Sequence, residues 1–302
     1  MAVPAFALDL QGHRGARGLL PENTLSAFAR ALDLGVTTLE LDCGLTRDGV
    51  VVVAHDRTLN PDLTRDAQGR WLESAGAAIR RLTFDELKRY DVGRIKPGTD
   101  YAKRFAKQEG MDGARIPALS DVFELVRKHG DSKVRFNIET KLSPLAPDET
   151  AAPDAFVQAL LGAIRKAGME RRVTIQSFDW RTLQIVQREA PGVPTVYLTA
   201  EGASPNNIPV DGTASSWTAG YQLAAFGGSV PRMVKAAGGA VWSPYHGDLT
   251  QARVREAQSL GLKVVVWTVN NEADMRRFIE WGVDGIISDY PDVLTSVAAK
   301  LP

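Results

Sequence analysis

Residues 37–46 read TTLELDCGLT, a short run of apolar and β-forming residues that carries two carboxylates. A run of this length and composition predicts a strand. Similar segments recur along the whole chain and alternate with stretches of helical periodicity. We expect strands at residues 8–13, 37–46, 133–140, 172–177, 193–199, 239–243, 263–268 and 283–288. Eight strands that alternate with helices predict a closed parallel (β/α)8 barrel, the TIM barrel, with an open doubly wound sheet as the alternative.

The segment 25–34 has the periodicity of an amphipathic helix. Its apolar residues at i, i+3, i+4 and i+7 are Leu25, Phe28, Ala29 and Leu32. Asn23 is the expected N-cap and is also a candidate to contact the functional site, and Gly35 follows the last turn. Further helices are expected near residues 120–129, 154–167, 180–190, 248–260, 271–281 and 291–299.

Two long connections interrupt this alternation. Residues 56–118 separate the second strand from the third, and Thr83-Phe84-Asp85-Glu86 within them has the form of a capping box that opens a short helix. Residues 200–230 are rich in Gly, Ser, Asn and Pro and lack clear periodicity. Connections of this length in a compact domain are often functional. We expect one barrel domain over residues 1–302, with 56–118 as an insertion.

The overall composition is that of an ordinary globular chain. Its 302 residues include 36 Lys+Arg and 36 Asp+Glu, so the formal net charge is zero. A balanced chain gives no indication of a nucleic-acid surface, although a local cluster of cations can still hold one phosphate. The single cysteine, Cys43, cannot form an internal disulfide. No apolar run approaches the roughly 18 residues of a membrane span.

The N-terminus leaves the location of the protein open. Ala5-Phe6-Ala7 has the small-x-small form of a signal-peptide cleavage site, but no basic and fully apolar regions precede it. The segment is therefore either the remnant of an export signal, on a periplasmic or secreted protein, or a short tail on a cytoplasmic one.

Glu40 and Asp42 are the first candidates for chemistry. Residues i and i+2 of a strand share a face, so both carboxylates point the same way, late in the second strand, where barrel enzymes place their active sites. Two adjacent carboxylates raise each other's pKa unless a cation lies between them. A solvated or ion-paired surface pair is the alternative, but the flanking Leu39 and Leu41 argue against an exposed face.

A hairpin is expected to bring His55 to these carboxylates. Asp48-Gly49 between β-forming residues is a strong hairpin signal. A two-residue turn there would pair Arg47 with Val50 and put His55 directly opposite Asp42. A slip of one residue would turn His55 to the other face.

His13 ends the first strand, which should neighbour the second. It is then expected beside the carboxylates, and Arg14 offers a planar guanidinium for a phosphate. A single histidine near a strand end is more often structural, but two that converge on one carboxylate pair favour a functional role. The other two, His129 and His246, lack such company and are expected to be structural or solvated.

The third strand adds another carboxylate. Asn137, Glu139 and Lys141 share one face, and Glu139 would lie one strand away from Glu40 and Asp42. Three carboxylates and water form an all-oxygen site, which suits Mg²⁺ or Ca²⁺ better than zinc. Lys141 would be a second cation for the phosphate. A surface ion pair between Glu139 and Lys141 is the alternative.

In this order, the motifs resemble those of the glycerophosphodiester phosphodiesterase family. The resemblance covers residues 9–298. Each motif is weak alone, but the ordered set is specific. Its members are His13-Arg14-Gly15, Pro21-Glu22-Asn23-Thr24, Glu40-x-Asp42, His55-Asp56, Glu139-x-Lys141 and Trp267-Thr-Val-Asn270.

The resemblance implies a barrel with an insertion after the second strand and a small-molecule glycerophosphodiester substrate. It implies one divalent cation held by Glu40, Asp42 and Glu139. It also implies acid/base roles for the two histidines, His13 and His55, and phosphate contacts from Arg14 and Lys141. Hydrolysis would give glycerol 3-phosphate and an alcohol. The preferred alcohol, the assignment of acid and base, and attack by water or by the neighbouring glycerol hydroxyl all stay open.

Three aromatic residues and one acidic residue could have either a structural or a functional role. Trp267 closes an apolar strand and is expected at the substrate mouth, with core packing as the alternative. Phe178 and Trp180 are expected to pack, and Asp289 is expected to cap the final helix, which has Pro291 near its start.

Three other functions are alternatives to the hydrolysis of glycerophosphodiesters. A lysophospholipase D acting on lipid substrates would use residues 200–230 as an apolar rim. An amidohydrolase typically carries His-x-His on the first strand, where this chain has His13-Arg14-Gly15. A binding protein without catalysis would not need intact His13 and His55. We expect a monomer or a small homo-oligomer.

Overall fold

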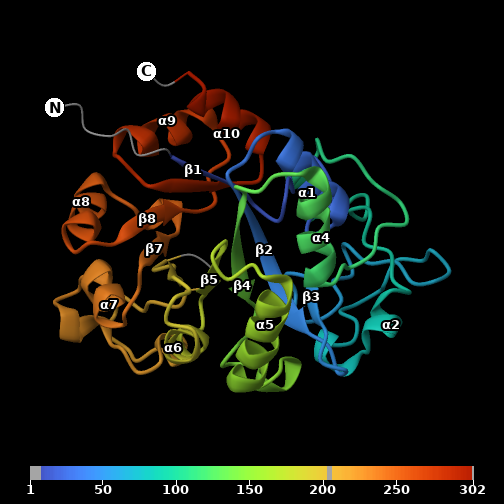
Figure 1. The fold of residues 1–302 in the computed structure, drawn as a ribbon, viewed down its shortest axis with the longest axis horizontal. Helices are drawn as coiled ribbons and strands as arrows, with labels where there is room; N and C mark the ends of the chain where they lie inside the picture. Colours follow the sequence, from blue (N-terminus) through green and yellow to red (C-terminus); the bar gives the residue numbers. More distant parts are fainter. Residues whose placement is uncertain (1–7, 203–205, 301–302) are drawn as a thin grey trace.

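A computed structural model of the chain describes residues 8–202 and 206–300 (Figure 1). The Ala5-Phe6-Ala7 sequence lies outside the described residues. The parallel strands close into a ring, because β1 hydrogen-bonds to both β2 and β9. The ring consists of β1 (Asp9–Gly12), β2 (Thr38–Leu45), β4 (Arg135–Thr140), β5 (Val173–Ser177), β6 (Thr195–Thr199), β7 (Val241–Pro244), β8 (Lys263–Val266) and β9 (Gly285–Ser288). The predicted TIM barrel is confirmed, and the open sheet is wrong.

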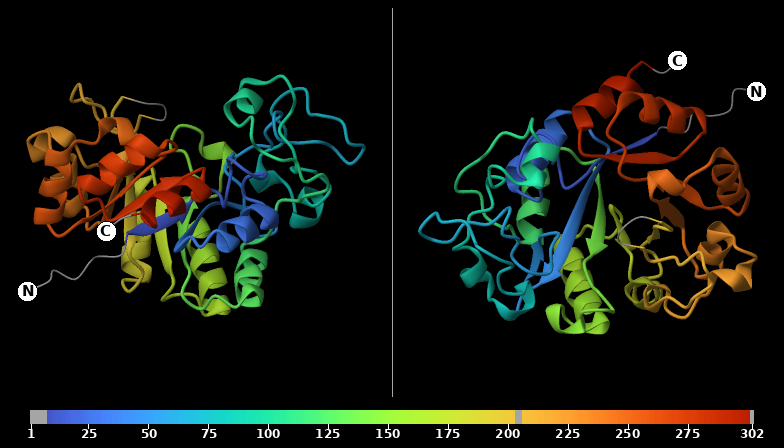
Figure 2. Two further views of the ribbon diagram at one scale, coloured as in Figure 1. Left: turned by 90° about the horizontal axis from the view of Figure 1, so that it is seen from above. Right: turned by 180° about the vertical axis from the view of Figure 1, so that it is seen from behind.

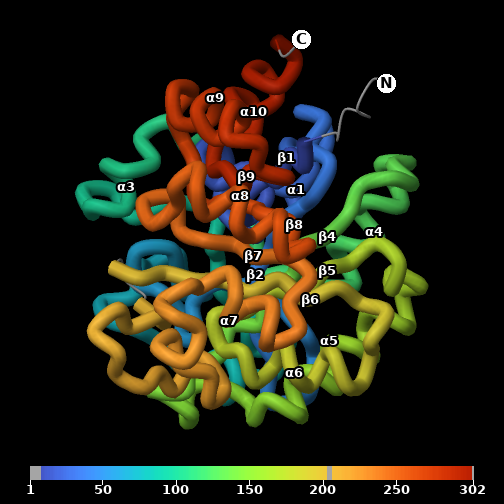
Figure 3. Tube along the Cα trace, turned by 90° about the vertical axis from the view of Figure 1, so that its left-hand side faces the viewer, coloured from blue at the N-terminus to red at the C-terminus, as the bar shows by residue number. Residues whose placement is uncertain are grey.

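Helices surround this ring (Figures 1 and 2). They are α1 (Leu25–Asp33), α4 (Leu119–His129), α5 (Pro153–Ala167), α6 (Trp180–Glu189), α7 (Val230–Ala236), α8 (Gln251–Ser259), α9 (Glu272–Glu280) and α10 (Pro291–Ala298). The last two pack against each other, and α10 contacts β1 (Figure 3). The sequence did not predict α7, which follows the Gly- and Ser-rich segment. None of the helices that the structure describes is long and apolar enough to cross a membrane.

The start of α1 differs from the prediction. Thr24 is the N-cap, and its hydroxyl accepts a hydrogen bond from the Ala27 amide. Asn23, the predicted cap, is buried with φ 56° and turns its side chain toward the barrel interior, where it reaches Asp42. The buried face of the helix is Ala27, Phe28, Ala31 and Leu32, so the predicted stripe was wrong at Leu25 and Ala29.

Strand β3 (Val51–Val53) lies outside the ring, antiparallel to β2. The predicted hairpin is therefore present, but its register was wrong by one residue. Cys43 pairs with Val53, and the Ala54 amide donates to the Asp42 carbonyl, so Asp42 faces Ala54 rather than His55. The turn has three residues, 47–49, instead of two.

The longer turn has a local cause. The Thr46 hydroxyl donates to the Asp48 carboxylate at 2.6 Å, and the Val50 amide donates back to that hydroxyl at 2.9 Å. Gly49 takes the left-handed conformation, with φ 81°. A three-residue hairpin loop commonly ends on a glycine in this conformation. An Asp-Gly pair therefore fits either turn length, and the Thr46 contacts favour the longer one.

The insertion between β3 and α4 stands beside the barrel (Figure 2). It contains the helices α2 (Phe84–Leu87) and α3 (Asp100–Arg104). The predicted capping box is confirmed, because the Thr83 and Glu86 side chains each bond the other residue's backbone amide. The insertion has its own apolar cluster, which packs on β3. Its buried members are Val52, Leu59, Ile79, Leu87 and Ile116.

The two faces of each barrel strand differ in character. The outward residues of β2 and β4, such as Leu39, Leu41 and Ile138, are fully buried against the helices. The inward residues of β1, β2, β4 and β5 are polar, whereas a small aliphatic cluster lines β6 to β9. The polar half of the interior, at the carboxyl ends of its strands, is where functional side chains collect.

Candidate active site

Three carboxylates converge at the carboxyl ends of β2 and β4. These strands pair in parallel, with Asp42 beside Glu139, so the inward side chains of both strands share one layer. One oxygen from each of Glu40, Asp42 and Glu139 lies within 4.8 Å of the others. The three residues are between 1% and 6% exposed. The structure thus brings together the predicted carboxylates and excludes the surface-pair alternatives.

Each carboxylate has a specific set of hydrogen-bond donors. Glu40 accepts from the Arg14 amide at 2.9 Å and from Gln176 Nε2 at 2.6 Å. Asp42 Oδ2 accepts from Asn23 Nδ2 at 2.9 Å. Glu139 Oε1 accepts from Lys141 Nζ at 2.8 Å. These donors fix the carboxylate orientations.

The pKa values of the cluster diverge. Burial, followed by the Asp42 carboxylate, raises the pKa of Glu40 well above its usual range. Burial also raises the pKa of Glu139, to about 7, despite the nearby Lys141 ammonium. Burial would raise the pKa of Asp42 as well, but Arg14 and then Lys141 outweigh it and lower that pKa. Burial therefore disfavours the charged forms of Glu40 and Glu139, whereas the two cations favour the charged form of Asp42.

A divalent cation fits these residues. Asp42 Oδ1 is buried and has no hydrogen-bond partner, and the Lys141 ammonium is 3.7 Å from it. A buried carboxylate oxygen without a partner is costly, and a bound cation removes that cost. The atoms that would bind the cation are all carboxylate oxygens, which match Mg²⁺ or Ca²⁺.

His13 follows β1 and lies at the edge of this cluster. Its Nδ1 is 2.6 Å from Asp289 Oδ1, and its Nε2 is 3.8 Å from Glu40 Oε2. Burial, with a further contribution from Arg17, lowers the pKa of His13 to about 4, so the ring is neutral near pH 7. Neutral imidazole with Nδ1–H on Asp289 leaves the Nε2 lone pair free.

Asp289 has a different role from the predicted helix cap. The N-cap of α10 is Tyr290, whereas Asp289 is buried and accepts bonds from His13, Arg17 and Asn270. The Arg17 guanidinium binds both carboxylate oxygens, at 2.7 and 2.9 Å. The cap prediction was wrong because two of the partners of Asp289, His13 and Arg17, come from the other end of the chain.

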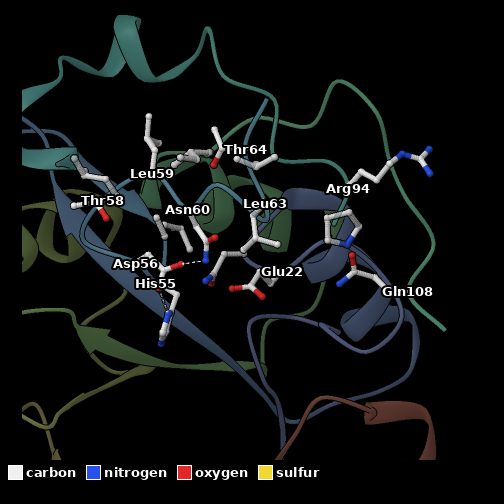
Figure 4. A pocket seen from close by; sticks show the side chains of 17 residues that line it. Glu22, His55, Asp56, Thr58, Leu59, Asn60, Leu63, Thr64, Arg94 and Gln108 are labelled. Carbon is white, nitrogen blue, oxygen red and sulfur yellow. Dashed lines mark hydrogen bonds and ion pairs between the residues drawn. The ribbon is translucent and has the colours of Figure 1, made fainter. Parts of the chain in front are cut away.

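His55 reaches the pocket although the predicted register was wrong. Strand β3 ends at Val53 and the chain bends, so strict alternation no longer determines the direction of His55. Its Nδ1 is 2.8 Å from Asp56 Oδ1, and Asn60 donates to Asp56 Oδ2 at 2.6 Å (Figure 4). Burial, and then the charge of Arg14, lowers the pKa of His55. Both histidines thus share one arrangement, with Nδ1 on a carboxylate.

The cations near the carboxylates are held by further acidic partners. Arg14 has φ 52°, which turns its amide to Glu40, and its Nη1 donates to Glu22 at 2.6 Å. Its Nε lies 3.2 Å from Asp42 Oδ2. Tyr101 of α3 donates its hydroxyl to Glu22 and lies 3.5 Å from Arg17 Nη1. The insertion therefore contributes directly to the network.

Many of these groups line one pocket of about 500 Å³. Its titratable lining residues include His13, Arg14, Glu40, His55, Glu139 and Lys141. Apolar and aromatic residues also line it, among them Phe178, Leu198, Trp217 and Trp267. Trp267 lies at this mouth, and its indole N–H donates to the Ser243 carbonyl at 2.9 Å.

The remaining aromatic and histidine predictions have mixed outcomes. Phe178 packs edge-on against Trp267, with ring centroids 5.4 Å apart, but it also lines the pocket, so packing alone was incomplete. Trp180 is fully buried, as predicted. His129 is on the surface near Asp33, and His246 is half-buried; neither lines the pocket.

Sequence reasoning missed several residues of the site. They are Arg17, Glu22, Tyr101, Gln176 and Asp289. For Asp289 and Gln176 a signal existed, since both lie at or just after the carboxyl end of a barrel strand. Tyr101 had none, because its position depends on how the insertion docks.

Comparisons with known proteins agree on one family. A model of the glycerophosphoryl diester phosphodiesterase family matches residues 13–293. The chain is 32% identical over 289 residues to a glycerophosphodiester phosphodiesterase of Caldanaerobacter subterraneus, covering 95% of this chain and 96% of that protein. It is 25% identical to human lysophospholipase D, over 97% of this chain and 85% of that protein.

A solved structure is also similar. A protein of Silicibacter pomeroyi, described as a putative glycerophosphoryl diester phosphodiesterase, superposes with a TM-score of 0.87 at 38% identity. The match covers 98% of this chain and 94% of that one.

Proposed function

The chain belongs to the glycerophosphoryl diester phosphodiesterase family and is an enzyme of that type, and we propose that it hydrolyses glycerophosphodiesters to glycerol 3-phosphate and an alcohol by metal-assisted acid/base catalysis. One observation carries the proposal. A buried three-carboxylate cluster, with an unpartnered oxygen on Asp42, shares one pocket with two histidines that are each fixed by a carboxylate.

Glu40, Asp42 and Glu139 would hold one divalent cation, Mg²⁺ or Ca²⁺. When bound, such a cation supplies positive charge that offsets the negative charge of a phosphodiester. Arg14 and Lys141 add their charge on the same side of the pocket. Phosphate oxygens repel a nucleophile, so these cations favour both binding and the transition state, in which charge builds up.

His13 and His55 would move the protons. In each ring the Nδ1–H donates to a carboxylate, Asp289 or Asp56, which fixes the tautomer and leaves Nε2 as the free position. One histidine, neutral, would take the proton of the attacking hydroxyl at Nε2. The other, protonated at both ring nitrogens, would donate its Nε2 proton to the leaving alcohol oxygen. Asp289 and Asp56 would act as positioning residues for these rings.

The aromatic side of the pocket would receive the alcohol part of the substrate. Phe178, Trp217 and Trp267 line the same pocket as the charged groups, and the Phe178 ring centroid is 6.0 Å from Lys141 Nζ, so a phosphate near Lys141 would have its alcohol close to these rings. The same apolar wall supports a second candidate, a lysophospholipase D activity on lysolipids. Human lysophospholipase D is a relative, at 25% identity.

A direct assay tests both functions. The protein is incubated with glycerophosphocholine or lysophosphatidylcholine in the presence of Mg²⁺ or Ca²⁺, and glycerol 3-phosphate or lysophosphatidic acid is measured. We expect glycerol 3-phosphate from the first substrate. In the same assay we expect His13→Ala to lose activity. His129→Ala is its matched control, because His129 lies outside the pocket. Turnover of the lysolipid alone would favour the second candidate, and no turnover of either would reject the proposal.

A further inference from the structure

Three amide side chains form a line through the barrel interior. They are Gln11 of β1, Asn137 of β4 and Gln176 of β5, and each is at most 3% exposed. The line begins at Asp9, at the amino-terminal end of the barrel, and ends at Glu40 in the pocket. Barrel interiors are usually filled with branched aliphatic side chains, so a buried polar line needs a reason.

Every link in this line is a hydrogen bond of 3.0 Å or less. Gln11 Nε2 donates to Asp9 Oδ2 at 2.9 Å. Asn137 Nδ2 donates to Gln11 Oε1 at 3.0 Å and to Gln176 Oε1 at 2.8 Å. Gln176 Nε2 then donates to Glu40 Oε1 at 2.6 Å. The Thr174 hydroxyl donates to Asn137 Oδ1 at 2.9 Å.

The polarity of the line is determined by its two ends. A carboxylate only accepts hydrogen bonds, so Asp9 and, when it is ionised as a cation ligand, Glu40 each require the adjacent glutamine to present its NH₂ group. Both glutamines must then turn their carbonyl oxygens toward the middle. Only a group with two N–H donors can satisfy two converging carbonyls, and the NH₂ group of Asn137 has two. Asn137 therefore sets the direction of Gln176, and through it the donor that Glu40 receives.

We propose that Asn137 and Gln176 are positioning residues for the metal ligand Glu40, with the NH₂ group of Asn137 fixing the orientation of the Gln176 amide. The inference rests on the proposed metal site. Glu40 Oε2 is held by the Arg14 amide, so Gln176 is the donor that holds the other oxygen, Oε1. Partners of this kind orient metal ligands and commonly change metal affinity about 10- to 100-fold when removed.

The isosteric substitution Asn137→Asp tests the polarity directly. An aspartate has nearly the same shape but no N–H, so Gln176 would have to rotate its NH₂ group toward residue 137 and its carbonyl oxygen toward Glu40. Two oxygens would then face each other, and Glu40 would lose its donor. We expect binding of Ca²⁺ or Mg²⁺ alone, measured by isothermal titration calorimetry, to weaken about 10- to 100-fold.

Thr174→Val is the matched control. It removes a hydrogen bond to the same Asn137 side chain, but it leaves both N–H donations in place. We expect its cation affinity to stay close to that of the wild type. Thermal unfolding of the cation-free proteins separates a general loss of stability, which both variants can show, from the specific loss of cation binding.

Gln176→Met provides a second test if Asn137→Asp does not fold. Methionine has a similar length, but it cannot donate to Glu40, so we expect weakened cation binding from a well-packed side chain. Wild-type cation affinity in a folded Asn137→Asp or Gln176→Met protein would overturn the positioning role of these two residues and leave the metal site standing. A wild-type protein that binds neither cation would overturn the metal site and the inference together.

Discussion

Tyr101→Phe tests how strongly the insertion is coupled to Arg14 and Arg17, which follow β1. The Tyr101 hydroxyl donates to Glu22, and Glu22 in turn accepts from Arg14. The same hydroxyl lies 3.5 Å from Arg17 Nη1, and Arg17 binds Asp289. One hydroxyl thus links the insertion to Arg14, through Glu22, and to Asp289, through Arg17. Phenylalanine would keep the ring contact with Phe105, whose centroid is 5.0 Å away, and would remove only the hydroxyl.

The size of the effect follows from the burial of Glu22. Its carboxylate belongs to a residue that is 9% exposed, so water replaces the lost donor poorly. A hydrogen bond to a charged group contributes about 1.5–3 kcal/mol, so we expect a loss of unfolding free energy of about 2 kcal/mol. If about 1.4 kcal/mol of this loss is expressed at Arg14 in the transition state, kcat/KM falls about tenfold.

The assay combines unfolding in urea with the kinetics of glycerophosphocholine hydrolysis. Thr99→Ala is the control for stability, because Thr99 caps the helix that carries Tyr101 and its loss costs about 1 kcal/mol without removing the hydroxyl. A double-mutant cycle with Glu22→Gln then isolates the contact. We expect the two substitutions to be non-additive in kcat/KM. Strictly additive effects, or an unchanged kcat/KM in Tyr101→Phe, would refute this coupling.

Three further predictions concern the site and the hairpin. His13→Ala and His55→Ala should each lower kcat about 10²-fold or more with smaller effects on KM, whereas His246→Ala should not; a normal kcat removes that histidine from the mechanism. Chelation by EDTA should abolish turnover and added Mg²⁺ or Ca²⁺ should restore it, so full activity of a metal-free protein would contradict the metal requirement. Gly49→Val should lower the unfolding free energy in urea by about 1–2 kcal/mol, because φ is 81°. An added Cβ meets nothing within 4 Å, so backbone strain is the expected cause, and Gly49→Asn should cost less. Equal stabilities of the two variants would show that the turn has relaxed.

The sequence predicted those features that depend on short-range periodicity. Alternation of strands and helices was enough for the barrel. The shared face of Glu40 and Asp42, together with a parallel neighbour that carries Glu139, was enough for the carboxylate cluster. The carboxylate prediction rests on the period of two along a strand, which tertiary structure cannot change without breaking the strand.

Features that depend on loop geometry or distant partners were not predictable in the same way. The register of the β2–β3 hairpin depends on the Thr46 hydroxyl, which selects a three-residue turn. Asp289 was taken for a helix cap because its partners, His13 and Arg17, lie more than 270 residues away in the chain. Tyr101 lies in an insertion with little regular structure, so no periodicity pointed to its side chain.

The outward side chains of the barrel strands stabilise the fold, and the inward side chains carry the chemistry. An interior of three carboxylates and a line of amides stabilises the fold less than aliphatic side chains would, since buried charges cost free energy unless they are paired. The outward faces of the same strands compensate, because Leu41 and Ile138, beside Asp42 and Glu139, are fully buried against the helices. Substitutions at the outward positions should therefore act on stability first. Conservative substitutions at the inward positions should act first on cation binding and turnover, because each inward group is held by a partner that the fold already provides.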